Sequence, residues 1–382
     1  MGREELIDCF HDTLDMANSR ILKNATIKCQ KSNRIYKENF LSKVPMRNEE
    51  PAIFVESSTT FATAQKYAYL GKTAVLNFAN PENPGGGVHF GAMAQEECLC
   101  RSSNLYSCLS SSNVYEDYYA YHRRLKTPFY TDRLIYTKDI IVFKDDSDIP
   151  QIMSRNKWFS VDVITCAAPY FAKCKYVNIV ELLQLFKDRI KNIVEAARDN
   201  DVAVLVLGAF GCGAFKNPPQ IVAEAFRYVL YEQGYLQCFK QVVFAIKPIS
   251  KNCPNLSAFS TVFDIRVPDS VYVMKNSNIK SVFYPDILRL TIESTGEIVE
   301  YQKEIVTVGR SPDSDLCLAG KYLARYHATF LYEHKMWFLR SDATNGIWIN
   351  GIKLMCGLKY QLVANDEIYF PKSEKVIFYK YG

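Results

Sequence analysis

The hydrophobic pattern of the first two-thirds of the chain alternates between short apolar runs and amphipathic stretches. Residues up to about Arg47 are mostly helical in pattern, and continuous apolar runs follow, typical of strands buried on both faces of a sheet. The expected strands are Ala52–Glu56, Thr73–Phe78, Arg133–Tyr136, Val161–Cys166, Val202–Leu207 and Gln241–Ile246. Apolar residues from Leu182 to Ala197 recur at helical spacing, and Asp199 marks the end of that helix. This alternation predicts an α/β domain with helices on both sides of its sheet.

The pattern changes after Ile246. Residues 247–286 are rich in proline, serine and asparagine, which predicts a tail and a linker. From Ile287 onward apolar and polar residues alternate with a period of two, as half-buried strands require. The expected strands include Leu288–Ile292, Glu304–Val308, Ala328–Tyr332, Met336–Leu339, Ile347–Ile349 and Lys375–Tyr379. We therefore expect a separate all-β sandwich of about a hundred residues.

Composition narrows the class of protein. The 382 residues suit two or three domains, and 48% hydrophobic with 23% charged residues is ordinary for a globular protein. The net charge of +5 is too mild to indicate a nucleic-acid surface. No apolar stretch is long enough for a signal peptide or a membrane span, so we expect a cytoplasmic protein.

The twelve cysteines are scattered rather than arranged as a disulfide framework. Several lie inside apolar runs, where cysteine usually serves as a small buried side chain. The closest pair, Cys98 and Cys100, has Cys-x-Cys spacing rather than the Cys-x-x-Cys of structural zinc sites. Since the five histidines form no cluster either, we predict no metal site.

Two glycine-rich loops carry the candidate chemistry. Gly85-Gly86-Gly87 follows the strand Thr73–Phe78, and Gln95-Glu96-Glu97 comes seven residues later at the start of a helix. Adjacent glycines let backbone N–H groups approach a ligand closely, and next to a helix start they can form a nest for phosphate oxygens.

The second loop, Gly208–Phe215, follows the strand that ends at Leu207. Asn217 and Pro218 then predict the N-cap and first residue of another helix. Because open α/β sheets bind ligands at the carboxyl ends of their strands, we expect the two glycine loops to meet there. Together they could hold both phosphates of a diphosphate.

The combination of Gly-Gly-Gly, a spacer of seven and Gln-Glu-Glu resembles the signature of poly(ADP-ribose) glycohydrolases. The longer segments Asn77–Leu109, Thr165–Pro169 and Gly208–Phe215 are similar to the compact microbial-type branch of that family. The resemblance covers roughly residues 1–265. It implies a macrodomain-like, three-layer α/β/α domain.

The resemblance also implies roles for individual residues. Glu97 would be the catalytic acid, Glu96 would hold ribose hydroxyls, Asn80 would contact the ribose beside the scissile bond and Phe215 would pack on the substrate. The other substrate-binding residues that it implies are Gly85, Gly86, Gly87, Gln95, Gly211 and Gly213.

Elementary chemistry is consistent with a glutamate in this role. Cleavage of a ribose–ribose bond requires protonation of a poor leaving group while the sugar gains oxocarbenium character. Burial and a neighbouring carboxylate can raise the pKa of a carboxylic acid enough for this task. Adjacent residues on a helix point about 100° apart, so Glu96 and Glu97 cannot flank the sugar from opposite sides. We expect one glutamate to act first as acid and then as base.

The C-terminal segment resembles a forkhead-associated (FHA) domain. The resemblance rests on Gly309-Arg310, Arg325-Tyr326-His327-Ala328, Thr344-Asn345-Gly346 and Asn350-Gly351, and FHA domains read phosphothreonine.

By this resemblance Arg310 would contact the phosphate, Thr344 and Asn345 would hold the phosphopeptide, and His327 would be structural. Ala324 departs from the family, which has a phosphate-binding serine there. Arg325, next to Ala324, would compensate for the missing hydroxyl.

The expected organisation is a catalytic domain over residues 1–265, with a helical N-terminal segment over 1–47, a linker over 266–286 and an FHA domain over 287–382. The expected partners are an ADP-ribose polymer or another ADP-ribosylated substrate, and a phosphothreonine-containing protein. We expect no cofactor, no membrane partner and no sequence-specific nucleic-acid binding.

Three alternatives stay open at the level of sequence. The first unit could be a non-catalytic ADP-ribose reader, or it could hydrolyse mono-ADP-ribosyl groups on protein or nucleic acid. The second could serve only as a scaffold.

Overall fold

The computed structural model describes residues 2–46, 51–174, 179–248, 253–263, 287–333, 336–362, 365–371, 373 and 375–379. The described residues within 1–175 and 182–265 form one compact unit, and those from 287 onward belong to a second. The expected linker, residues 266–286, lies outside the described residues.

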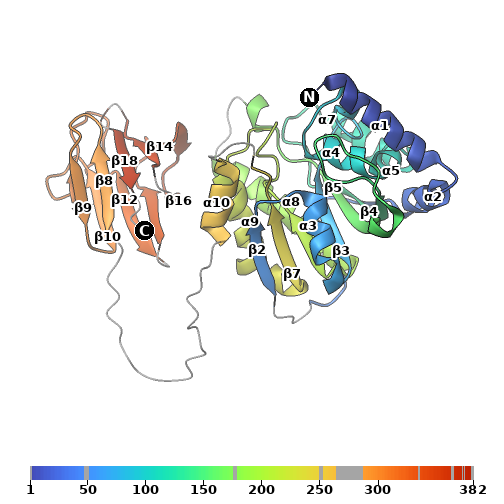
Figure 1. The fold of residues 1–382 in the computed structure, drawn as a ribbon. Coiled ribbons are helices and arrows are strands. Elements are labelled where there is room, and N and C mark those ends of the chain that lie inside the picture. The colour runs from blue at the N-terminus through green and yellow to red at the C-terminus, as the bar shows by residue number, and fades with distance from the viewer. Residues whose placement is uncertain are drawn as a thin grey trace. The chain divides into compact units, whose positions relative to one another are not determined.

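The first unit contains a seven-stranded mixed sheet with the order β1-β4-β5-β3-β6-β7-β2 (Figure 1). Strands β5, β3, β6, β7 and β2 are parallel, whereas β4 runs antiparallel to both β5 and β1. The strands are β1 Arg34–Tyr36, β2 Ala52–Glu56, β3 Thr73–Phe78, β4 Leu134–Val142, β5 Phe159–Cys166, β6 Val204–Leu207 and β7 Gln241–Ala245.

The six strands expected in this unit are confirmed, with shifted ends in β4, β5, β6 and β7. The N-terminal segment, expected to be mostly helical up to Arg47, also contains the strand β1. That three-residue strand pairs with β4, with Arg34 opposite Tyr136 and Tyr36 opposite Leu134. It is too short for its hydrophobic period to be read, so only the pairing defines it.

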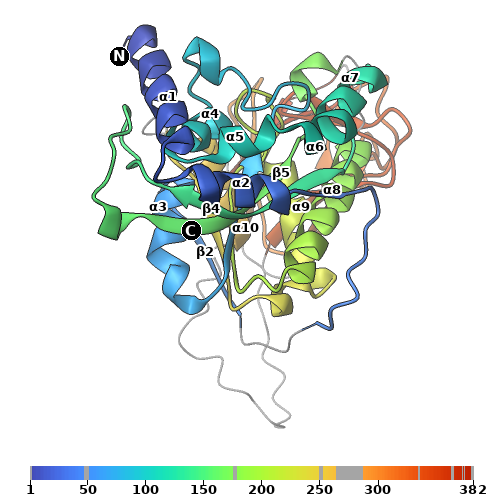
Figure 2. The same ribbon diagram turned by 90° about the vertical axis from the view of Figure 1, so that its right-hand side faces the viewer.

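Ten α-helices are described in the first unit, and α1, α2, α4 and α5 pack into one group (Figure 2). They are α1 Arg3–Asn18, α2 Lys23–Ser32, α3 Thr60–Tyr67, α4 Gln95–Ser102, α5 Leu105–Leu109, α6 Ser112–Val114, α7 Tyr121–Leu125, α8 Ile179–Asp199, α9 Pro219–Arg227 and α10 Pro254–Phe263. The expected helix ending at Asp199 is confirmed as α8. None of the described helices is both long and apolar enough to cross a membrane.

Two helix predictions need correction. The N-cap of α9 is Pro218 and its first residue is Pro219, so the predicted N-cap Asn217 and first residue Pro218 were each one position too early. Asn217 instead donates its side-chain amide to the carbonyls of Pro169 and Gly211, at 2.7 and 2.9 Å. The stretch after Ile246 also contains a helix, α10, although its prolines predicted only a tail. Pro254 occupies the first helical position, which tolerates proline.

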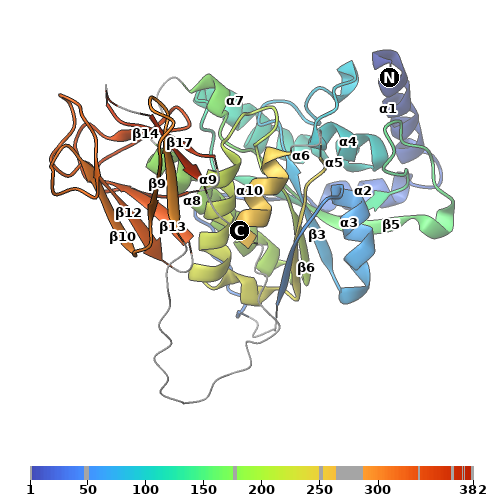
Figure 3. The ribbon, with the colours of Figure 1, turned by 60° about the vertical axis from the view of Figure 1, so that its left-hand side comes forward.

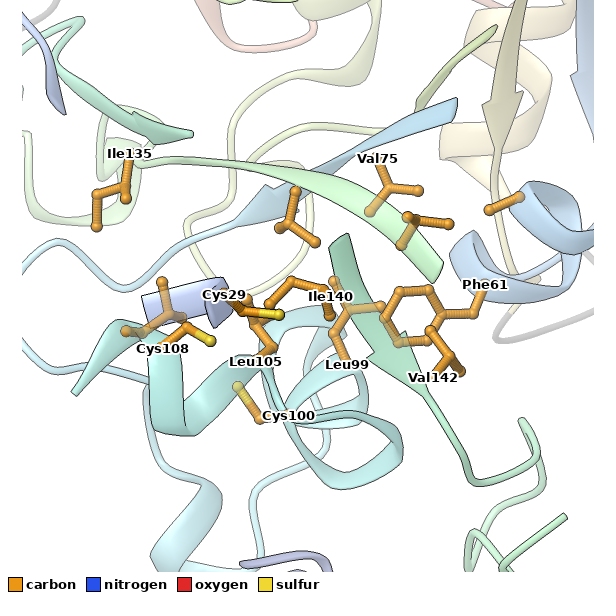
Figure 4. Packing of buried hydrophobic residues seen from close by; sticks show 14 of the residues in the cluster. Cys29, Phe61, Val75, Leu99, Cys100, Leu105, Cys108, Ile135, Ile140 and Val142 are labelled. Atoms are coloured by element: carbon orange, nitrogen blue, oxygen red, sulfur yellow. The ribbon is translucent and has the colours of Figure 1, made fainter. Parts of the chain in front are cut away.

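The core beneath the candidate site packs α4 and α5 onto the sheet (Figure 4). Leu99 and Cys100 of α4 and Leu105 of α5 are buried in one cluster with Phe61 of α3 and Val75 of β3. Burial of a leucine-sized side chain contributes about 1.5–3 kcal/mol. This packing holds the first turn of α4 beside the carboxyl end of β3. All twelve cysteines of the chain are free thiols, and Cys29, Cys100 and Cys108 belong to this cluster.

The second unit consists of two β-sheets (Figure 3). The five-stranded sheet has the order β11-β10-β12-β13-β16, and the six-stranded sheet has the order β15-β14-β17-β18-β8-β9. Every strand named in the sequence analysis is present, and β9, β11, β15, β16 and β17 are additional. The strands are β8 Leu288–Ile292, β9 Ile298–Tyr301, β10 Ile305–Gly309, β11 Leu316–Cys317, β12 Ala328–Glu333, β13 Met336–Ser341, β14 Ile347–Ile349, β15 Ile352–Leu354, β16 Lys359–Gln361, β17 Glu367–Tyr369 and β18 Lys375–Tyr379.

Candidate active site and phosphopeptide site

A cavity of about 390 Å³ lies at the carboxyl end of β3, within the size range of small-molecule sites. Its wall brings together residues from many separate places in the chain, as expected for a crevice at the ends of parallel strands. The main contributors are Ser58–Thr60 before and in α3, Phe78–Asn80 at the end of β3 and after it, Met93–Gln95 and Glu97–Leu99 around the start of α4, Asp146–Asp148, and the loop from Ala209 to Phe215 without Cys212.

Glu97 faces this cavity from the first turn of α4. Its Oε1 accepts a hydrogen bond of 2.8 Å from the backbone N–H of Gly87. Its Oε2 is buried and has no hydrogen-bond partner among the described residues. Buried polar atoms are almost always hydrogen-bonded, so an unpartnered oxygen on a cavity wall indicates a place where a ligand can bind.

Glu96 is 2% exposed and does not line the cavity. Its Oε2 accepts a hydrogen bond of 2.6 Å from the backbone N–H of Asn80, and its Oε1 accepts a longer one of 3.4 Å from Asn77 Nδ2. Burial raises the pKa of Glu96 to about 8. The hydrogen bond from Asn80 N–H lowers this pKa, whereas the negative charge of Glu97 raises it. The Glu96 carboxyl is therefore mainly protonated at neutral pH.

Gly86 lies against both carboxyl groups, which leave no room for a side chain there. A Cβ atom at this position would lie 2.5 Å from Glu97 Oε1 and 3.3 Å from Glu96 Oε2, and the φ of +56° also favours glycine. Gly85 is equally restricted, since its Cβ would lie 2.7 Å from the ring of Tyr106. Residues 85–87 do not line the cavity; in this structure they support Glu97, and their contact with a diphosphate stays a prediction.

The side chain of Gln95 ties α4 to the sheet. Its Oε1 accepts a hydrogen bond of 2.8 Å from Phe78 N–H, and its Nε2 donates to the Leu76 carbonyl at 2.8 Å and to Thr60 Oγ1 at 3.1 Å. Gln95 also lines the cavity, but these three bonds occupy its amide. In the structure it therefore positions the two glutamates that follow it.

Asn80 lines the cavity, and among the described residues only the oxygen of its side-chain amide is hydrogen-bonded. Its Oδ1 accepts hydrogen bonds of 2.9 Å from the backbone N–H groups of Glu82 and Asn83. Its Nδ2 makes no hydrogen bond with any described residue, so this donor is available to a ligand hydroxyl.

The second glycine loop forms the opposite wall. Gly211 has a φ of +74°, and a Cβ there would lie 2.4 Å from Ala168 Cβ, whereas a Cβ on Gly213 would meet nothing within 4 Å. Phe215 stacks on Tyr170 with ring centroids 4.5 Å apart and planes 12° from parallel. Gly211, Gly213 and Phe215 all line the cavity together with Glu97, whereas the glycines of the first loop do not, so the predicted meeting of both glycine loops at the cavity is found only for the second.

Several cavity residues had no signal in the sequence. Thr59 donates a short hydrogen bond from its hydroxyl to Asp146 Oδ2, and Lys247 forms an ion pair of 3.3 Å with Asp148. All four line the cavity. They come from three separate loops without a motif, and only the polar run after the strand Ala52–Glu56 could have indicated Thr59.

In the second unit, the loops predicted to bind a phosphopeptide lie together. The backbone N–H of Arg310 donates to the Ala324 carbonyl at 3.1 Å, and Asn345 Nδ2 donates to the Tyr322 carbonyl at 2.9 Å. His327 is fully buried; its Nδ1 accepts a hydrogen bond of 3.0 Å from Ala324 N–H, and its Nε2 lies 2.9 Å from the Gly346 carbonyl. His327 thus joins two of these loops.

The side chains at this place are exposed. Arg310 and Arg325 both reach solvent, and neither forms an ion pair among the described residues. Thr344 and Asn345 are exposed as well. A Cβ on Gly309 would lie 2.0 Å from the Arg325 carbonyl, so this glycine allows the strand carrying Arg310 to approach the loop carrying Arg325.

Comparison with known proteins places both units in families. Residues 5–145 match the catalytic domain of microbial-type PARG, where PARG stands for poly(ADP-ribose) glycohydrolase, and residues 306–371 match the FHA domain. No curated protein matches the chain.

Solved structures extend the match to the whole first unit. The poly(ADP-ribose) glycohydrolase from Thermomonospora curvata, bound to the inhibitor ADP-HPD, is 30% identical with a TM-score of 0.60, over 68% of this chain and 100% of that one. The enzyme from Deinococcus radiodurans, in complex with ADP-ribose, is 32% identical with a TM-score of 0.56, over 63% of this chain and 97% of that one. The chain therefore belongs to the microbial-type poly(ADP-ribose) glycohydrolase family, with an FHA domain in its C-terminal unit.

Proposed function

We propose that the first unit hydrolyses the ribose–ribose O-glycosidic bonds of poly(ADP-ribose) and releases ADP-ribose. The observation that carries this proposal is the state of Glu97 on the cavity wall. One of its oxygens is held by Gly87 and the other is unpartnered, beside a Glu96 carboxyl that retains its proton. The match to glycohydrolases with ADP-ribose or an inhibitor bound supports the choice of substrate.

Glu97 would act at the scissile bond through Oε2. For this step the Glu97 carboxyl would first have to take up a proton. As the bond between the anomeric carbon and the leaving oxygen breaks, Glu97 would give that proton to the leaving oxygen, and the sugar would become an oxocarbenium ion. The resulting carboxylate would then take a proton from the attacking water, which restores the acid. Since Glu96 is mainly neutral, its charge does not add to that of Glu97 during this cycle.

The remaining site residues would bind the substrate. Asn80 Nδ2 has a free donor for a ribose hydroxyl, and Gly213 leaves backbone open to a diphosphate. Phe215, fixed by its stack on Tyr170, offers an aromatic surface. Glu96 would orient the loop at Asn80, because it accepts the hydrogen bond from that backbone N–H.

A substrate panel tests the activity. The full chain would be incubated with automodified poly(ADP-ribose), with a mono-ADP-ribosylated peptide and with an ADP-ribosylated oligonucleotide, and released ADP-ribose would be measured. We expect release from the polymer. Release from the mono-ADP-ribosylated substrates alone would assign a different linkage, and binding of ADP-ribose without release from any substrate would make the chain a reader.

For the second unit we propose phosphothreonine-dependent targeting. Arg310 and Arg325 provide two cations without ion-pair partners among the described residues, next to the Thr344–Asn345 loop, which suits a dianionic phosphate. Titration of phosphothreonine peptides and their unphosphorylated forms tests this role. Equal affinity for both forms would leave only scaffolding.

The finer description of the fold also belongs to this proposal. Successive residues of a strand point to opposite faces, and Phe244 and Ala245 of β7 do so here. Ala245 belongs to the core formed with α3 and α4, whereas Phe244 packs on Phe226 of α9 and Phe259 of α10. These contacts support a three-layer, macrodomain-like α/β/α arrangement. A cytoplasmic location stays a prediction from the sequence.

A further inference from the structure

A short loop beside the catalytic carboxylate presents an exposed aromatic side chain. The 3-10 turn η2, Val88–Phe90, begins directly after Gly87, the residue whose N–H holds Glu97. Phe90 is 67% exposed, and Met93 on the same loop is 49% exposed and lines the cavity. Two large apolar side chains are therefore exposed to solvent in the segment that connects the glycine cluster to the catalytic glutamates.

The backbone of this loop is fixed. Phe90 N–H and Ala92 N–H both donate to the Gly87 carbonyl, at 2.9 and 3.2 Å. Arg3 of α1 donates from Nε to the Phe90 carbonyl at 2.6 Å, and a Cβ on Gly91 would lie 2.7 Å from the Arg3 carbonyl. The position of Phe90 is thus set by the same hydrogen-bonded turn that positions Glu97.

The other face of the loop is fixed by aromatic packing. His89 Nε2 forms a hydrogen bond of 2.7 Å with the Tyr106 hydroxyl, and Phe10 packs edge-on against the His89 ring at 4.9 Å. Phe90 does not take part in this packing, although it is adjacent to His89. Its exposure is therefore a property of an ordered loop, and an exposed aromatic side chain on an ordered loop suits the binding of a ligand.

The charge beside Phe90 indicates what kind of ligand. Arg3 is exposed and forms no ion pair with the described residues, and its Nε donates to the backbone carbonyl of Phe90, so a cationic side chain is held at the same turn as the exposed ring. Aromatic faces combined with cations are the usual means by which proteins hold unpaired nucleotides, since the ring stacks on the base and the cation attracts the phosphate.

We propose that Phe90, with Arg3, forms a second subsite that stacks the adenine of the ADP-ribose unit on the leaving-group side of the scissile bond. This inference rests on the proposed function. Each unit of the polymer carries one adenine, and the bond is cut at Glu97. The chain that leaves must pass close to Glu97. The η2 turn lies there, since it follows Gly87, whose N–H holds Glu97, and precedes Met93, which lines the cavity. The subsite would contribute to binding of the polymer but not of free ADP-ribose, because a single ADP-ribose unit in the cavity has no second adenine to reach Phe90.

Binding to a non-cleaving background tests the subsite independently of turnover. In Glu97→Gln we would measure the affinity for free ADP-ribose and for a defined ADP-ribose oligomer, with and without Phe90→Ala. We expect Phe90→Ala to weaken oligomer binding about tenfold and to leave ADP-ribose binding unchanged. Phe90→Trp should retain oligomer binding, since it keeps an aromatic face.

Tyr69→Ala provides the matched control. Tyr69 is 79% exposed but precedes β3, at the end of the strand opposite the cavity, so its removal should change neither affinity. Oligomer binding that is unchanged by Phe90→Ala would overturn the subsite, as would an equal loss for oligomer and ADP-ribose. An oligomer affinity that responds to Phe90 while the wild-type chain cleaves no substrate would refute the proposed hydrolysis and keep the subsite. A stronger effect of Phe90→Ala on single-stranded nucleic acid than on the oligomer would assign the surface to that other ligand and overturn the inference.

Discussion

Gly87 N–H holds Glu97 Oε1 at 2.8 Å, and this hydrogen bond gives the glycine cluster a role other than lining the cavity. The loop supplies a backbone donor that orients the carboxylate, while Gly86 keeps the space between Glu97 and Glu96 free of a side chain. Glu97 Oε2 is then the oxygen left for the substrate. The Glu97 carboxylate therefore requires both glycines beside it, because Gly87 supplies its hydrogen-bond donor and Gly86 leaves space for its oxygen.

Replacement of Glu97 by glutamine should abolish turnover and retain binding. Glutamine keeps the shape and can still accept the hydrogen bond from Gly87, but it cannot give up a proton as a carboxylic acid does. We expect hydrolysis to fall by about 10²–10⁴-fold. Release of ADP-ribose from the polymer and calorimetric titration with ADP-ribose measure the two properties. Full turnover in this variant would remove Glu97 from the role of acid.

A Cβ at residue 86 should disturb the same carboxylate without removing it. In Gly86→Ala the methyl group would collide with Glu97 Oε1 at 2.5 Å, and displacement of a catalytic group by about 1 Å can cost about 100-fold in rate. Gly234→Ala is the matched control, because Gly234 has a similar φ of +77° but open space around its Cβ position. Both variants should lose about 1 kcal/mol of stability from backbone strain, and only Gly86→Ala should lose activity. Equal rates for the two variants would contradict the packing role of Gly86.

Much of this site could be predicted from sequence because its residues are contiguous. The glycine cluster and the two glutamates lie within thirteen residues, and Gly211–Phe215 follow a strand whose continuous apolar run is unambiguous. Glu97 and the second loop meet at one crevice because β3 and β6 are parallel neighbours. Local pattern and topology were sufficient here.

The features that were not predicted depend on long-range contacts. The side-chain amide of Gln95 could bind a ligand, but in the structure it is hydrogen-bonded to Phe78, Leu76 and Thr60. The local sequence does not show that these partners lie beside it. Helix α10 was not predicted because its sequence lacks a polar face that would reveal a helical period. Its helix is instead supported by packing of Phe263 on Phe244. The pKa shift falls on Glu96, since burial decides it and the sequence does not show which of two adjacent glutamates is buried more deeply.

The buried carboxyl of Glu96 should make stability depend on pH. Its pKa in the folded protein is about 8, well above the ordinary value of about 4.3, so the folded state binds more protons than the unfolded state between these values. The contribution is fully present below the lower value and is lost as pH rises through the upper one. The free energy of unfolding should fall by up to about 1.4 kcal/mol per pH unit across this window. Glu96→Gln, which stays neutral, should remove this slope, and urea unfolding at several pH values compares the two proteins. Parallel curves would show that Glu96 is ionised in the folded state at neutral pH.

The phosphopeptide site should gain affinity from a hydroxyl at residue 324. Ala324 lies between the two loops of the site, since its carbonyl accepts a hydrogen bond from Arg310 N–H and its own N–H donates to His327 Nδ1. In Ala324→Ser a hydroxyl would reach the phosphate held by Arg310, and a hydrogen bond to a charged group contributes about 1.5–3 kcal/mol, or about tenfold or more in affinity. Arg310→Ala should lose at least as much, whereas Arg310→Lys should keep part of the binding because it keeps the charge. Fluorescence anisotropy with a phosphothreonine peptide measures each affinity, and the unphosphorylated peptide is the control. A serine that leaves the affinity unchanged, together with an Arg310→Ala variant that binds as well as the wild type, would place the phosphate elsewhere and make this unit a scaffold.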